Sequence, residues 1–113
     1  MVTIYHNPRC SKSRETLALL NTRGIEPEVV LYQQTPPDRE TLLILLQKLG
    51  MQSARELMRT KEAIYSELAL ADKNESALLD ALVENPVLIE RPIVINGDKA
   101  RIGRPPEAVL DIV

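Results

Sequence analysis

Apolar residues in the first third of the chain follow a strand pattern, then a helical one, then a strand pattern again. The segment Val2–Tyr5 is β-branched and aromatic and ends at a turn signal, which is typical of a strand. Apolar positions then recur at helical spacing over Ser11–Arg23, and Gly24 is a typical helix stop. Glu28–Tyr32 predicts a second strand. Because a helix separates the two strands, we expect a parallel β-α-β unit.

The middle of the chain carries helical patterns only. Three of its patterns begin with a residue or motif that favours a helix N-terminus. The sequence predicts four segments here: Arg39–Leu49 after a capping box at Thr35–Asp38 and closed by Gly50, a short helix opened by a capping box at Ser53–Glu56 and carrying Leu57, Met58 and Arg59, a weaker turn and helical piece over Glu62–Leu70, and Glu75–Glu84 capped by Asn74.

The last part of the chain returns to strand patterns. Val87–Gly97 is extended and apolar, and Asn96-Gly97-Asp98 is a tight hairpin signal that leads into the segment "KARIG". Arg104–Glu107 predicts the start of a final helix, whose apolar residues Val109, Leu110 and Ile112 are expected to pack on the sheet. The whole pattern predicts an α/β fold in the order β-α-β, helices, β-β-α.

Composition narrows the class of protein without identifying it. The chain has 113 residues, the length of one ordinary domain. A formal net charge of -2 offers no general attraction for nucleic acid. No run approaches the roughly 20 apolar residues that a membrane helix needs, and no secretory signal is visible, so we expect a cytoplasmic location with no membrane partner.

Candidate chemistry gathers around Cys10, the only cysteine. A single cysteine forms no internal disulfide, so any redox cycle needs a thiol from another molecule. A lone cysteine is most often a small buried apolar residue. Here Arg9, Lys12 and Arg14 surround it at a predicted helix N-terminus, and both basic charge and a helix N-terminus favour the thiolate. We therefore predict a pKa for Cys10 below that of a free thiol.

The residues beside Cys10 suggest an anion site. Backbone N–H groups from Ser11 to Arg14 are expected to cradle an oxyanion, with hydroxyl donors from Ser11 and Ser13, although ordinary helix capping is an equal alternative for Ser11. His6, the only histidine, is either an imidazolium that faces the thiolate or simply a polar residue at a strand end. One cysteine and one histidine supply two of the usual four zinc ligands, so no metal site is expected.

Three further arginines stand at positions that fix a side chain. Arg91 and Arg104 each precede a proline, and Arg59 ends the short capped helix. A solvated arginine is nevertheless the normal case, and Arg39, Arg55 and Arg101 are read as surface charge.

Three separated segments resemble the glutaredoxin-linked bacterial arsenate reductases of the ArsC family. They are "IYHNPRCSKSRETL", "LMRTKEAIY" and "NPVLIERPIVINGDKARIGRPPEAVLDI", and together they cover most of the chain. The resemblance implies a thioredoxin/glutaredoxin-like mixed sheet with a helical insertion after the second strand, as a single domain over residues 1–113.

The resemblance also implies roles for individual residues. Cys10 would be the nucleophile that attacks arsenate, and the oxyanion would be held by Arg59, Arg91 and Arg104. The loop residues His6, Ser13 and Arg14 would support the thiolate, and Pro92 would be the cis-proline beside it. No cofactor would be bound. Because the position that would carry a resolving cysteine is Ser13, glutathione would act as co-substrate and glutaredoxin as protein partner.

Two other readings stay open at this point. Spx-type regulators share this fold and bind RNA polymerase, but many sense redox state through a C-x-x-C pair, which is C-x-x-S here. A glutathione-dependent thiol reductase with another substrate would keep the enzyme class and change only the molecule that is reduced.

Overall fold

A computed structural model describes all residues of the chain, Met1–Val113. The chain forms two compact units. Unit 1 contains Met1–Thr35 and Arg91–Val113, and unit 2 contains Pro36–Glu90. The single domain over residues 1–113 stays a prediction.

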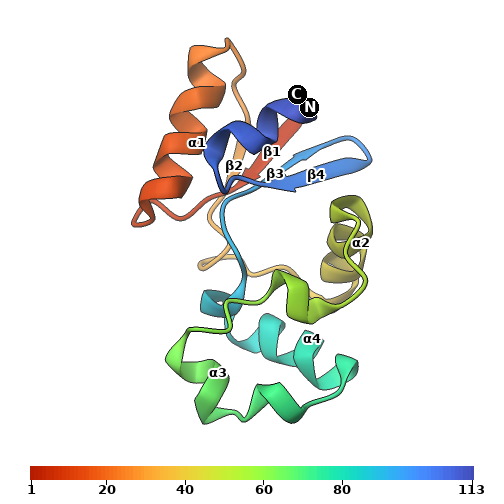
Figure 1. The fold of residues 1–113 in the computed structure, drawn as a ribbon. Coiled ribbons are helices and arrows are strands. Elements are labelled where there is room, and N and C mark those ends of the chain that lie inside the picture. The colour runs from red at the N-terminus through yellow and green to blue at the C-terminus, as the bar shows by residue number, and fades with distance from the viewer. The chain divides into compact units, whose positions relative to one another are not determined.

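Unit 1 is built on a mixed four-stranded sheet in the order β2-β1-β3-β4. Strand β1 pairs in parallel with β2, whereas β1 with β3 and β3 with β4 are antiparallel. The predicted β-α-β and β-β-α arrangements are therefore confirmed (Figure 1). Its elements are β1 (Val2–Tyr5), α1 (Ser11–Thr22), β2 (Glu28–Val30), β3 (Ile93–Asn96), β4 (Lys99–Ile102) and the 3-10 helix η4 (Pro106–Asp111).

Helices α1 and η4 pack against each other and against the sheet. Ile4 of β1, Leu20 of α1, Val94 of β3 and Val109 of η4 are fully buried in one cluster. Burial of side chains of this size contributes about 1.5–3 kcal/mol each relative to exposure. This cluster fixes the loop between β1 and α1, which carries Cys10.

Unit 2 is built from helices, apart from one isolated β-bridge between Met58 and Ile89. Helix α4 packs against α2 and against two 3-10 helices, η1 and η3. Leu42 and Leu45 of α2 and Leu78 and Leu82 of α4 are among its buried leucines. Its elements are α2 (Arg39–Leu49), η1 (Ala54–Leu57), α3 (Ala63–Glu67), η2 (Leu70–Asp72), α4 (Glu75–Glu84) and η3 (Pro86–Leu88).

The predicted caps of unit 2 are partly confirmed. Asn74 caps α4, and the capping box at Ser53 is present. The box predicted at Thr35 is wrong, because Asp38 is the N-cap of α2 and its carboxylate accepts the Thr41 N–H at 2.8 Å. Pro36 would be the first helical residue after a cap at Thr35, but it precedes Pro37, and the residue before a proline is disfavoured in helical backbone angles.

Three predicted boundaries are also wrong. Strand β2 ends at Val30, since the Leu31 carbonyl accepts N–H groups of two following residues and turns the chain. Helix η1 ends at Leu57, and Met58 instead forms a β-bridge with Ile89. Within the segment predicted as extended from Val87, a 3-10 turn comes first and β3 starts only at residue 93.

The helices are short. The longest, α1, has 12 residues, and α2 has 11. No helix has both the length and the apolar character that crossing a membrane requires.

Candidate active site around Cys10

Cys10 lies at the N-cap position of α1, as the sequence predicts. Its backbone is extended, with φ -95° and ψ 123°, and its side chain is half-buried. The Cys10 N–H donates to the Asn7 carbonyl at 3.0 Å, and the Arg14 N–H donates to the Cys10 carbonyl at 3.0 Å. Because the Arg14 amide is used in this way, an amide cradle at the start of α1 extends only from Ser11 to Ser13.

The pKa of the Cys10 thiol is lowered, as predicted. Burial by itself raises this pKa. The backbone N–H of Ser13, the Arg91 guanidinium, the N–H of Lys12 and the charge of Arg104 act in the opposite direction, and together they outweigh the burial. The site therefore favours a thiolate, the reactive form of cysteine.

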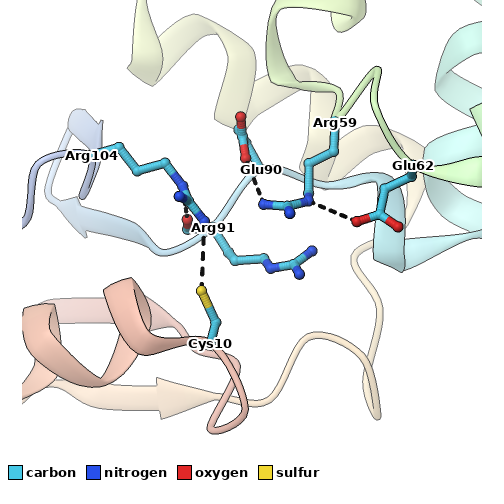
Figure 2. A network of polar contacts seen from close by, with 6 residues as sticks. All are labelled: Cys10, Arg59, Glu62, Glu90, Arg91 and Arg104. Atoms are coloured by element: carbon cyan, nitrogen blue, oxygen red, sulfur yellow. Dashed lines mark hydrogen bonds and ion pairs between the residues drawn. The ribbon is translucent and has the colours of Figure 1, made fainter.

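Two arginines from the end of unit 1 lie over the sulfur (Figure 2). The Arg104 guanidinium donates to Cys10 Sγ at 3.6 Å, and its Nε donates to the Arg91 carbonyl at 2.8 Å. The peptide bonds Arg91–Pro92 and Arg104–Pro105 are both cis. Arg91 lies just before β3 and Arg104 just after β4, and both bring positive charge to the same thiolate.

Arg14 and Lys12, next to Cys10 in the sequence, bond to groups other than the thiol. The Arg14 guanidinium donates to the Pro8 carbonyl at 2.9 Å, so it closes the loop. Lys12 is paired with Glu15 at 3.5 Å, with both side chains about half exposed. The predicted direction of the thiol pKa shift is right. The arginines that lower the pKa, however, are Arg91 and Arg104, which are distant in the sequence, and not the arginines of the loop.

His6 and Ser13 form a buried pair behind the loop. His6 Nδ1 and Ser13 Oγ are 2.6 Å apart, and the Asn7 N–H donates to the same Ser13 oxygen at 3.0 Å. Burial, and secondarily the Arg14 charge, lower the pKa of His6. The ring is therefore neutral near neutral pH, and the expectation that an imidazolium faces the thiolate is not supported. His6 holds the loop through Ser13.

A close approach between three elements lies next to Arg104. A Cβ atom on Gly103 would stand 2.5 Å from Thr16 Oγ1 and 2.8 Å from Pro92 Cγ. Thr16 is fully buried, and its hydroxyl donates to the Lys12 carbonyl at 2.8 Å. Sequence reasoning missed both Thr16 and Gly103. The only available signal was a glycine between a strand and an Arg-Pro pair.

Arg59 belongs to unit 2 and is held within that unit. Its Nε donates to Glu62 Oε1 at 3.1 Å and its Nη1 donates to Glu90 Oε1 at 3.1 Å (Figure 2). Its backbone N–H donates to the Leu88 carbonyl at 2.7 Å. About a quarter of its side chain is exposed. Neither carboxylate partner was anticipated from the sequence.

Comparison with known proteins places these features in one family. The ArsC family model matches residues 5–112. The chain is 67% identical to the uncharacterized protein YfgD of Escherichia coli K12, over 99% of this chain and 96% of that protein. It is 54% identical to an arsenate reductase of Haemophilus influenzae, over 99% of this chain and 98% of that protein.

A solved structure agrees with the sequence relatives. An arsenate reductase from Vibrio cholerae superposes with a TM-score of 0.97 at 54% identity, covering 99% of this chain and 97% of that one. The sheet and helices described above therefore form the thioredoxin-like fold that the resemblance implies. With its cysteine loop, its sheet and nearly its whole length matched, the chain belongs to the ArsC family.

Proposed function

We propose that the protein reduces arsenate to arsenite, with Cys10 as the nucleophile and glutathione and glutaredoxin as the source of electrons. The observation that carries the proposal is the Cys10 thiol, whose pKa is lowered and whose sulfur lies 3.6 Å from the Arg104 guanidinium. Relatives called arsenate reductases support the choice of substrate.

The arrangement suits an anionic substrate because it places positive charge beside the Cys10 thiolate. A thiolate and an oxyanion repel each other, and fixed positive charge offsets the repulsion. Arg91 and Arg104 supply that charge in unit 1, and arginine matches a tetrahedral oxyanion with paired N–H donors. We extend the oxyanion role to Arg59 on the family resemblance. Donors of this kind are worth about 3 kcal/mol each where charge develops on oxygen.

The proposed first step forms a bond between the Cys10 sulfur and arsenic. One oxygen of arsenate leaves as water, using protons from solvent, and arsenic remains As(V) in the adduct. His6 and Ser13 shape the loop that presents the sulfur, through their 2.6 Å contact.

The second step needs a thiol that the chain lacks, since Cys10 is its only cysteine. We propose that a glutathione thiolate attacks the Cys10 sulfur. The electron pair of the sulfur–arsenic bond passes to arsenic, which leaves as arsenite, and Cys10 is left in a mixed disulfide with glutathione. A glutaredoxin thiol then removes the glutathione and restores Cys10. Two thiols are oxidised to one disulfide for each arsenate reduced.

The test is a coupled assay in which NADPH oxidation is followed with glutathione, glutaredoxin and glutathione reductase present. Arsenate-dependent turnover is expected, and it should vanish in Cys10→Ser. Arg104→Gln should lower turnover because it removes the donor to Cys10 Sγ. Its matched control is Arg101→Gln, because Arg101 is exposed and its side chain donates only to the Ala100 carbonyl. Turnover with thioredoxin and no glutathione would contradict the proposed reductant. Absence of turnover, with Cys10 still reactive toward iodoacetamide, would contradict arsenate as the substrate.

A further inference from the structure

Arg59 is an unusual candidate for anion binding because two acids already hold it. Its ion pairs with Glu62 and Glu90 are both 3.1 Å long, and each side chain of the three is between a quarter and a third exposed. With ordinary charges the three side chains sum to -1. A cluster of this sign attracts no anion by charge alone.

The hydrogen-bonding capacity of the cluster tells more than its charge. A guanidinium has five N–H donors, of which Glu62 and Glu90 take two. Three N–H donors of Arg59 remain to bind oxygen atoms of a ligand. The carboxylates beside them are only acceptors. A ligand at Arg59 therefore meets donors and carboxylate acceptors side by side.

This combination distinguishes oxyanions by their protons. Near neutral pH arsenate and phosphate carry at least one O–H group, whereas sulfate carries none. A protonated oxyanion can accept from Arg59 and donate its O–H to a carboxylate, which makes a strong charge-assisted hydrogen bond. Sulfate can only accept, so its oxygens would face the carboxylate oxygens with no hydrogen between them.

We propose that Glu62 and Glu90 are specificity-determining residues that make Arg59 select oxyanions carrying a proton and reject sulfate. The inference rests on the proposed function, because that function gives Arg59 its role toward the oxyanion. It gives the two acids a role toward the ligand in addition to holding Arg59.

The test is calorimetric titration of phosphate and of sulfate into the wild-type protein and into Glu62→Gln, Glu90→Gln and the double variant. Neither anion is reduced, so binding is measured without turnover. Glutamine keeps an acceptor for Arg59 but adds N–H donors and removes the charge. Glu67→Gln is the matched control for each single variant, since Glu67 ends α3 and is exposed, and its substitution removes the same single charge from unit 2.

The wild-type protein is expected to bind phosphate more tightly than sulfate. In the double variant, the dissociation constant for sulfate divided by that for phosphate should fall by about tenfold or more. This is the factor that one charge-assisted hydrogen bond represents. Glu67→Gln should leave it unchanged. Equal gains for both anions, an unchanged ratio, or a wild-type protein that binds neither anion would overturn the inference. Failure of the proposed function is read separately, as absent arsenate turnover in the wild type.

Discussion

The packing beside the candidate site is tested most directly by Gly103→Ala, which adds one methyl group where Gly103 meets Thr16 and Pro92. The new Cβ would stand 2.5 Å from Thr16 Oγ1, 2.8 Å from Pro92 Cγ and 3.2 Å from Thr16 Cγ2. None of these atoms moves easily. Thr16 is fully buried with its hydroxyl bonded to the Lys12 carbonyl, and Pro92 is a ring.

The cost is estimated from overpacking. Inserting a methylene into a packed core costs about 1–3 kcal/mol, and two contacts under 3.0 Å place Gly103→Ala in the upper half of that range. For a chain of this size we expect the melting temperature to fall by roughly 4 °C for each kcal/mol. Turnover should also fall, because the adjacent Arg104 is the donor to Cys10.

The assay is urea unfolding of Gly103→Ala, Thr16→Ala and the double variant. Thr16→Ala removes two of the three close atoms, so the double variant should be more stable than additivity predicts, by about 1 kcal/mol. Gly50→Ala is the contrasting control: its methyl group meets open space but its φ is 73°, so its cost is backbone strain that Thr16→Ala does not relieve. Additive free energies in the Gly103 pair would refute the reasoning.

Three other predictions follow from single contacts. The rate of Cys10 alkylation by iodoacetamide should titrate below the ordinary pKa of a thiol, and Arg104→Gln should move the midpoint upward because it removes the charge 3.6 Å from the sulfur. The pKa of His6 is lowered from 6.5 in the folded protein, so the unfolded chain binds the proton first and the free energy of unfolding should fall as the pH decreases below about 6.5. His6→Gln should remove this part of the pH dependence. The same change of unfolding free energy with pH in both proteins, measured by urea unfolding, would contradict the prediction. Glu75 accepts from the Ala54 N–H and, at 2.8 Å, from the Ser53 hydroxyl, so Glu75→Ala should lower the free energy of unfolding by about 1 kcal/mol while Glu67→Ala should not.

Local patterns determine most of the elements of this protein. The strand Val2–Tyr5, the helix that starts beside Cys10, and the hairpin at Asn96–Asp98 all follow from periodicity and turn residues, and the structure confirms them. These features depend on near neighbours in the sequence. The errors lie where a local signal had a competitor, as at Thr35, where the following prolines left the N-cap of α2 to Asp38.

For the candidate site, the sequence predicts the kind of chemistry, and the tertiary structure decides which groups perform it. A cysteine at a helix N-terminus predicts a thiolate, because the dipole and the free N–H groups are properties of the helix alone. The arginine charges that assist it come from positions 91 and 104, and the loop arginine at 14 turns away to a carbonyl. Nearness in the sequence does not show which arginines reach the thiolate, since hydrogen bonds and burial depend on contacts in the folded chain. The same holds for His6, which is neutral because burial outweighs its ordinary basicity, and for the carboxylates on Arg59, one of which lies 31 residues away along the chain.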